Sequence, residues 1–252
     1  MQNKTTAKTI LWNETDFLDT VSNDFNFAKS LLNDFIIQTE SLLSSIPNSI
    51  EKKDFEAVNV TIPYKQTVIP YLDSVSEIAS RIGAVNTVVN RDGKLYGYNT
   101  DYYGMKALIE RLGLDLSGKK VLVLGTGGTS KTARAVASDL GAREILTVSR
   151  RKSDENITYE EASELHSDAE IIINTTPSGM YPDIESKPID ISPFSHLMGV
   201  VDAVYNPICT NLVLDARNRG IKAEGGLYML VMQAVVAVEK FLDKKIKRTT
   251  IV

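Results

Sequence analysis

The second half of this 252-residue chain constrains the fold most, because wholly apolar segments alternate there with segments of helical periodicity. VLVLG, EILTVS, EIIINTT and GVVDAVY are predicted to be strands, and SKTARAVASDLG, EEASELH and LVLDARNRG are predicted to be helices. Strands that are apolar at every position are typical of a parallel sheet covered by helices on both faces. An α/β fold is therefore expected for this half.

The first hundred residues lack this strict alternation. AVNVTIP is predicted to be a strand that ends at proline, SVSEIASRIG a helix that ends at Gly83, and AVNTVVNRDGKLYGYNTD a hairpin that turns at Asp92-Gly93. Two further short strands are expected at Thr9 to Trp12 and Asp34 to Thr39. We therefore predict two α/β domains, residues 1–102 and residues 103–226, with a final helix in residues 227–252 that packs back on the first domain.

Composition excludes several classes of function. The formal net charge of −4 gives no general attraction to nucleic acid or to an anionic membrane. The most apolar stretch, Gly225 to Val238, is too short to cross a bilayer. A single cysteine, Cys209, and two histidines without ligand-like spacing predict no disulfide and no metal site, and favour the cytoplasm. The sequence leaves open whether the chain forms a homodimer.

A glycine-rich turn joins the first apolar strand of this half to a helix. In VLVLGTGGTSKTA, Gly125 and Gly127 occupy the first two glycine positions of the dinucleotide-binding fingerprint, and Ser130 occupies the third. The first glycine permits a tight turn, the second lets the backbone approach a pyrophosphate, and the helix directs its N–H groups at the phosphates. An ordinary turn is the alternative, but the strand before and the helix after favour a Rossmann-like nucleotide site.

The next strand ends in Ser149, Arg150 and Arg151, where an NAD site usually carries a carboxylate. Arginine holds a phosphate through paired charge-assisted hydrogen bonds but has no special affinity for a bare hydroxyl. A solvated basic turn is the simpler explanation. Because these arginines come directly after the fingerprint unit, they favour NADP over NAD as the cofactor.

Three segments before residue 102 contain candidate catalytic or binding residues. NVTIPYK places Thr61 and Lys65 near one sheet edge, GAVNT places Asn86 beside an apolar strand, and GYNTD places Asp101 where the hairpin ends. Each has a structural alternative: Lys65 as a surface lysine, Asn86 as a turn former and Asp101 as a helix N-cap.

The segments together resemble the shikimate dehydrogenase family. The resemblance extends from about Phe55 to about Phe241 and rests on eight segments in family order: NVTIPYK, IGAVNTVV, GYNTDYYG, LGTGGTSKTA, SRR, NTTPSGM, DAVYNP and GGLYMLVMQA. It implies reversible reduction of 3-dehydroshikimate to shikimate with NADPH, a step of aromatic amino acid biosynthesis. It also implies that Lys65 and Asp101 are the catalytic pair and that the substrate is bound by Thr61, Asn86, Tyr205 and Gln233. The implied cofactor residues are Gly125, Thr126, Gly127, Gly128, Thr129, Ser130, Ser149, Arg150, Arg151, Thr175, Gly225 and Met229.

The chemistry of these residue types suits the implied roles. Reduction of a ketone places negative charge on its oxygen, which a lysine ammonium stabilises and can protonate. A neighbouring aspartate would keep that ammonium charged and oriented. Threonine, asparagine and glutamine replace the water that the hydroxyls of a cyclic polyol lose on binding. No metal is required, because nicotinamide supplies the hydride.

The first fifty residues depart from the family. Its members carry a Ser-x-Ser element that grips the substrate carboxylate, whereas this chain reads NETDFLDTVSND after TILW, with acidic Glu14, Asp16 and Asp19. We expect the anchor to come from elsewhere in the fold. Two alternatives stay open: a substrate that lacks this contact, or a divergent relative that binds NADP but has weak or no shikimate activity. A quinate/shikimate dehydrogenase of relaxed specificity is the nearest competing enzyme.

Overall fold

The computed structural model describes residues 55–61 and 63–246. The chain divides into two units, Met1–Phe55 and Glu56–Val252, and the fold below is that of the second. The two strands predicted before residue 40, and the acidic segment at the expected position of the Ser-x-Ser element, lie outside the described residues.

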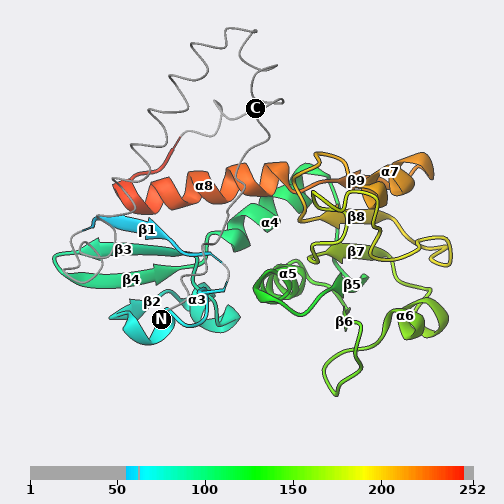
Figure 1. Ribbon diagram of the computed structural model, residues 1–252, viewed down its shortest axis with the longest axis horizontal. Helices are drawn as coiled ribbons and strands as arrows, with labels where there is room; N and C mark the ends of the chain where they lie inside the picture. The colour runs from blue at the N-terminus through cyan, green and yellow to red at the C-terminus, as the bar shows by residue number, and fades with distance from the viewer. Residues whose placement is uncertain (1–54, 62, 247–252) are drawn as a thin grey trace, which may run out of the picture. The chain divides into compact units, whose positions relative to one another are not determined.

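A four-stranded mixed sheet forms the first part of the described chain (Figure 1). Its spatial order is β1-β3-β4-β2; β1 and β4 pair antiparallel with β3, and β2 pairs parallel with β4. The elements are β1 (Ala57–Asn59), the 3-10 helix η1 (Ile69–Tyr71), β2 (Ser74–Val75), α3 (Glu77–Ile82), β3 (Thr87–Arg91) and β4 (Lys94–Tyr98).

The predicted hairpin is confirmed. Strands β3 and β4 join at Asp92 and Gly93, whose φ angles of 53° and 80° are those of a two-residue turn that matches the twist of the strands. The predicted end of α3 is also confirmed, since Gly83 caps it with a φ of 70°. The strand expected over AVNVTIP is shorter than predicted, because only Ala57–Asn59 pairs with β3.

The second part is a five-stranded parallel sheet of order β6-β5-β7-β8-β9 (Figure 1). The predicted α/β fold with a parallel sheet is therefore confirmed. Its strands are β5 (Lys120–Leu124), β6 (Glu144–Val148), β7 (Ile171–Asn174), β8 (Gly199–Asp202) and β9 (Lys222–Glu224), and its helices are α5 (Gly128–Asp139), α6 (Tyr159–Leu165) and α7 (Asn211–Asn218). Strand β9 was not predicted, because its three residues, Lys-Ala-Glu, carry little apolar signal.

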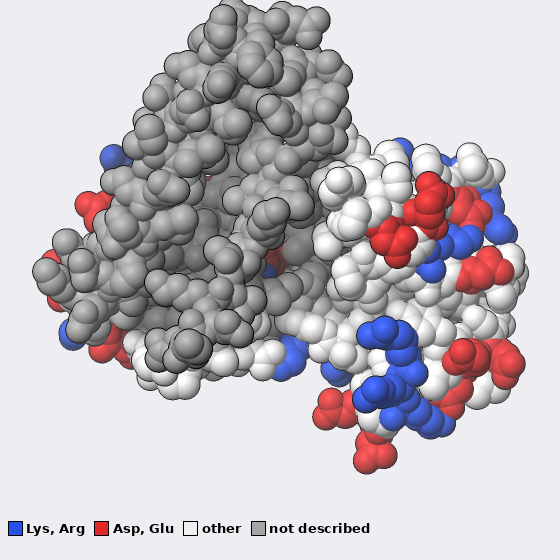
Figure 2. Space-filling model, in the orientation of Figure 1, with Lys and Arg blue, Asp and Glu red and all other residues white. Residues whose placement is uncertain are grey.

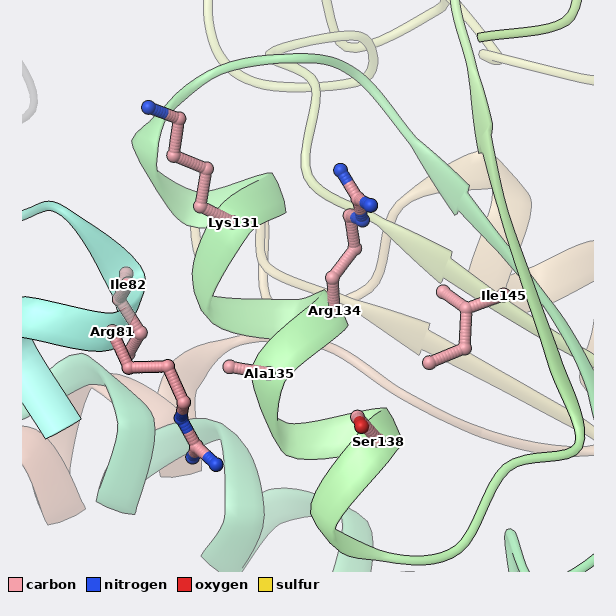
Figure 3. A pocket seen from close by; sticks show the side chains of 7 residues that line it. All are labelled: Arg81, Ile82, Lys131, Arg134, Ala135, Ser138 and Ile145. Carbon is pink, nitrogen blue, oxygen red and sulfur yellow. The ribbon is translucent and has the colours of Figure 1, made fainter. Parts of the chain in front are cut away.

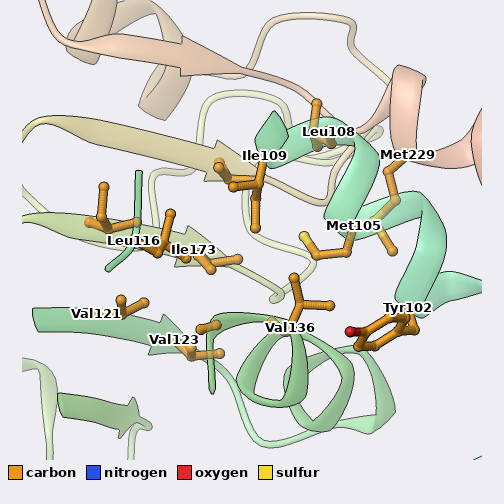
Figure 4. Close-up of a cluster of buried hydrophobic side chains, with 14 of the residues drawn as sticks. Tyr102, Met105, Leu108, Ile109, Leu116, Val121, Val123, Val136, Ile173 and Met229 are labelled. Atoms are coloured by element: carbon orange, nitrogen blue, oxygen red, sulfur yellow. The ribbon is translucent and has the colours of Figure 1, made fainter. Parts of the chain in front are cut away.

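The parallel sheet is buried on both faces, which explains its continuous apolar strands. One face packs against α4 (Asp101–Arg111), α5 and the start of α8 (Leu227–Leu242). The other face packs against α6, α7 and the segment that leads into β8. Figure 4 shows the first cluster, in which Met105 and Ile109 of α4 meet Val123, Val136 and Ile173.

Helices α4 and α8 pack closely side by side. Gly104 permits this approach, since a Cβ atom there would lie 2.5 Å from the carbonyl oxygen of Met229. Helix α8 also contacts β3 of the four-stranded sheet. Among residues 55–61 and 63–246, no helix combines the length and apolar character needed to span a membrane.

Candidate functional site

A pocket of 310 Å³ collects polar side chains from distant parts of the chain. Its lining comes from β1 and the loop after it, the start of β3, the first residues of α4 and α5, the loop after β8, and α8. The lining residues are Asn59, Val60, Thr61, Lys65, Asn86, Asp101, Thr129, Ala203, Tyr205, Gly226, Met229, Leu230 and Gln233.

Lys65 and Asp101 form an ion pair in this pocket. The Lys65 Nζ atom donates to Asp101 Oδ2 at 2.6 Å, and the two side chains are 16% and 12% exposed. Asp101 is the first residue of α4, and the N-cap position belongs to Thr100. The alternative of Asp101 as an N-cap is therefore wrong: its carboxylate meets a lysine 36 residues away in sequence.

Asn86 and Thr100 form a buried polar network beside this pair. Asn86 Oδ1 accepts from the Thr100 backbone N–H at 2.7 Å, and Asn86 Nδ2 donates to Thr100 Oγ1 at 3.0 Å. Thr100 Oγ1 in turn donates to Gln233 Oε1 of α8 at 3.4 Å. The two residues meet because they flank the paired strands β3 and β4, so Asn86 is fixed in place by its own hydrogen bonds.

Thr61 and Tyr205 line the same pocket from the loops after β1 and β8. Thr61 is placed by the hydrogen bond from the preceding Val60 N–H to the Asn86 carbonyl, at 2.8 Å. Tyr205 lies three residues after β8 and is about half exposed. All six residues that the resemblance assigned to catalysis and substrate binding thus line one pocket.

The glycine-rich turn between β5 and α5 is shaped for a phosphate group. Gly125 has a φ of 104°, a backbone conformation that is strained for any residue with a side chain. A Cβ atom there would also lie 3.0 Å from Thr175 Oγ1. Gly127 is the N-cap of α5, no side chain caps it, and Cβ atoms at Gly127 or Gly128 would meet nothing within 4 Å. The N-terminus of this twelve-residue helix therefore has no side-chain cap at Gly127, which fits an anionic ligand.

Four further predicted cofactor residues follow β6 and β7, the two strands that flank β5. Ser149 follows β6 directly, and the side chains of Arg150 and Arg151 are exposed. Thr175 follows β7, but its hydroxyl donates to the Leu124 carbonyl at 2.6 Å and so supports the turn. In contrast to Thr129 and Met229, none of these four residues lines the 310 Å³ pocket.

Gly225 and Gly226 precede α8 and pack tightly against the loop after β8. A Cβ atom at Gly225 would lie 2.4 Å from the Ile208 carbonyl oxygen, and one at Gly226 would lie 2.2 Å from the Ala203 carbonyl oxygen. These close approaches bring the start of α8, with Met229, against the loop after β8. Both glycines of the segment GGLYM are therefore required by packing, because neither position has room for a side chain.

A buried carboxylate that the sequence analysis did not identify holds the loops at this edge of the sheet. Asp202 accepts from Asn174 Nδ2 at 2.9 Å, from the Val204 N–H at 2.9 Å and from Thr210 Oγ1 at 2.6 Å. Burial raises the pKa of Asp202, and these three donors oppose part of the rise. Polar residues at the ends of two neighbouring apolar strands were the available signal.

A second hollow, of 450 Å³, is lined by residues of α3, α5 and β6 (Figure 3). It is lined by Arg81, Ile82, Lys131, Arg134, Ala135, Ser138 and Ile145. None of the predicted site residues is among them. Beside it, Arg81 forms a two-bond ion pair with Asp139, and Tyr102 donates to the same carboxylate at 2.6 Å.

Comparisons with known proteins identify the family that the chain resembles. Residues 22–88 match the family described as the shikimate dehydrogenase substrate binding domain. A shikimate dehydrogenase (NADP(+)) from Clostridium beijerinckii is 41% identical over 214 residues, covering 81% of this chain and 78% of the relative.

Solved structures give the same result. Shikimate dehydrogenase 1 from Peptoclostridium difficile is 38% identical with a TM-score of 0.73, covering 82% of this chain and 79% of that one. Shikimate 5-dehydrogenase from Thermus thermophilus, solved in complex with NADP(H) and shikimate, is 30% identical with a TM-score of 0.69, covering 77% and 76%. The chain therefore belongs to the shikimate dehydrogenase family.

Proposed function

We propose that this protein is an NADP-dependent shikimate dehydrogenase, which interconverts 3-dehydroshikimate and shikimate. The observation that carries the proposal is the Lys65–Asp101 ion pair in a pocket lined by Thr61, Asn86 and Gln233. Relatives that are 41% and 38% identical to this chain over the aligned residues carry the shikimate dehydrogenase name.

In this proposal Lys65 is the proton donor. Its ammonium group stabilises the charge that develops on the ketone oxygen and passes a proton to it; in the reverse direction the amine takes the proton from the hydroxyl group. Asp101 orients the ammonium through their 2.6 Å hydrogen bond. Because both side chains are largely buried, the interaction is weakly screened by solvent.

Thr61, Asn86, Tyr205 and Gln233 are proposed to bind the ring hydroxyls, which need partners once they lose water. NADP would be held by the turn from Gly125 to Ser130, with Arg150 and Arg151 on the additional phosphate and Gly225 and Met229 near the nicotinamide. When bound, the nicotinamide supplies or accepts the hydride.

The predicted domains fit this division of labour and remain proposals. Residues 1–102 with the helix in 227–252 would form the substrate domain, and residues 103–226 the cofactor domain. The contact of α8 with β3 supports assigning that helix to the first domain, and its contact with α4 joins it to the second. A cytoplasmic location rests on the single cysteine, Cys209. A homodimer stays a prediction, which light scattering tests.

Steady-state oxidation of shikimate and of quinate, each with NADP⁺ and with NAD⁺, tests the proposed function. We expect the highest kcat/KM with shikimate and NADP⁺. Higher kcat/KM with quinate would favour the enzyme of relaxed specificity. Tight NADP⁺ binding without turnover of either alcohol would favour the divergent, non-catalytic relative and contradict the proposal.

A further inference from the structure

The segment that follows β6 folds back on itself, and we name residues 149–157 the arginine loop. The Ser149 N–H donates to the Ile157 carbonyl at 2.9 Å, and the Ile157 N–H donates to the Thr147 carbonyl at 3.0 Å, so the loop leaves the sheet edge and returns beside it. Ser153 and Asn156 close its tip with reciprocal backbone hydrogen bonds. The loop therefore has a defined shape.

Two side chains fix the backbone of Arg151 inside this loop. Ser149 Oγ accepts from the Arg151 N–H at 3.2 Å and donates to the Arg151 carbonyl at 2.5 Å. Asn156 Nδ2 donates both to Ser149 Oγ and to the Arg151 carbonyl, each at 3.2 Å. The Asn156 amide thus links both ends of the turn that carries Arg150 and Arg151.

The cations of the loop are not equivalent. Lys152 pairs with Glu161, which also completes the capping box of α6. Among the described residues, Arg150 and Arg151 are exposed without an ion pair. The charge of Arg150 lies close enough to Tyr159 to oppose the rise that burial causes in that tyrosine's pKa. Figure 2 shows Lys and Arg side chains gathered over the loop after β6.

We infer that Asn156 is a positioning residue for coenzyme selectivity, which holds the arginine loop so that Arg150 and Arg151 face the additional phosphate of NADP. The inference rests on the proposed function and adds a residue to it. A guanidinium group binds a phosphate with two parallel hydrogen bonds only in a narrow range of orientations. A loop that is already ordered loses less conformational freedom when the ligand binds.

The effect should be confined to the coenzyme's additional phosphate. No residue of the arginine loop lines the pocket of Lys65 and Asp101. NAD lacks this phosphate, so loosening the loop should leave NAD⁺ binding unchanged. A merely structural role of Asn156 would instead weaken the use of both coenzymes alike.

The test compares Asn156→Ala with the wild-type chain in shikimate oxidation. We expect the KM for NADP⁺ to rise by about 3- to 10-fold. Without Asn156, binding must also order the loop, and the conformational entropy lost is about that of immobilising one side chain. The kcat with NADP⁺ and the kcat/KM with NAD⁺ should stay unchanged. Asn156→Asp removes the same donors and adds a negative charge beside the arginines, so its KM for NADP⁺ should rise further.

Asn211→Ala is the matched control. Its amide also fixes a loop by donating to two carbonyls, those of Ile184 and Glu185, but it lies away from the arginine loop. It should leave the ratio of kcat/KM for NADP⁺ and NAD⁺ unchanged. An unchanged KM for NADP⁺ in Asn156→Ala, or an equal loss with both coenzymes, would overturn the inference.

Calorimetric titration with NADP⁺ and NAD⁺ separates this inference from the proposed function. If the wild-type chain oxidises no shikimate, the proposed function fails, but the inference still predicts a 3- to 10-fold weaker Kd for NADP⁺ alone in Asn156→Ala. If the wild-type chain binds NADP⁺ no more tightly than NAD⁺, the inference fails as well.

Discussion

The proposed substrate pocket and the glycine-rich turn lie next to each other but are built from different parts of the chain. The pocket is made of side chains, such as Lys65, Asp101 and Gln233, that are distant in sequence. The turn is made of backbone, and its glycines matter because of φ angles and open N–H groups. Shortening one side chain in the pocket should therefore lower kcat. Adding a side chain to a glycine of the turn should instead weaken the binding of the ligand.

The largest effect is expected for Lys65→Ala. Removing the proposed proton donor should lower kcat by about 10²- to 10⁴-fold, the usual contribution of a general acid, while the Kd for NADP⁺ stays unchanged. Stopped-flow or steady-state kinetics with a calorimetric Kd measures both. Lys187→Ala, which removes a lysine paired with Asp215 far from the pocket, is the control and should keep full turnover.

Asp101→Asn should have the next largest effect. A hydrogen bond between charged groups contributes about 1.5–3 kcal/mol, so losing the charge that orients Lys65 should lower kcat by about 10- to 100-fold. Asp115→Asn is the control, because Asp115 accepts only from the Ser117 N–H in an exposed turn. Equal kcat values for the two variants would show that Asp101 has no part in the chemistry.

Gly125→Ala probes the backbone site. The new methyl group would sit at a φ of 104° and 3.0 Å from Thr175 Oγ1, so we expect the Kd for NADP⁺ to rise by about tenfold with a smaller change in kcat. Gly118→Ala has a similar backbone strain, with a φ of 69°, but its Cβ atom would meet nothing within 4 Å. It should reduce stability by about 1 kcal/mol and leave the Kd unchanged.

The smallest effect concerns an ion pair outside the pocket. Arg81 lowers the pKa of Asp139, so this pair should stabilise the fold above about pH 4, the unfolded value, and lose its contribution as pH falls through the lower folded value. Because the side chains of Arg81 and Asp139 are 50% and 29% exposed, Asp139→Asn should cost about 1 kcal/mol or less at pH 7.

Urea unfolding of both proteins from pH 7 to pH 3 measures this cost. The difference between wild type and Asp139→Asn should shrink as the medium becomes acidic, and turnover at pH 7 should change little. A difference that grows toward acidic pH would contradict the assignment. Together with Asp101→Asn, this result would separate an ion pair that serves chemistry from one that serves stability.

The sequence predicted best what is encoded locally. The hairpin at Asp92-Gly93, the helix end at Gly83 and the glycine turn at Gly125 each depend on a few adjacent residues, and the structure has all three. Strand β9 escaped prediction because its register depends on β8 and not on its own short sequence.

The site could be assembled from the sequence only through the family resemblance. Nothing local indicates that Lys65 meets Asp101, or that Thr100 reaches Gln233 on a helix 133 residues later. Asn156 and Asp202 were missed because their importance lies in the hydrogen bonds they make after folding. The sequence pattern alone does not indicate which side chains meet when they are far apart in the chain.

A crystal structure of the protein with NADP⁺ and shikimate tests the central claim most directly. The quantity to measure is the distance from Lys65 Nζ to the oxygen on the ring carbon that faces the nicotinamide. We expect hydrogen-bond contact, about 2.6–3.2 Å, with Asp101 still paired to the lysine. A shikimate ring bound elsewhere, or a Lys65 side chain turned away from it, would contradict the account.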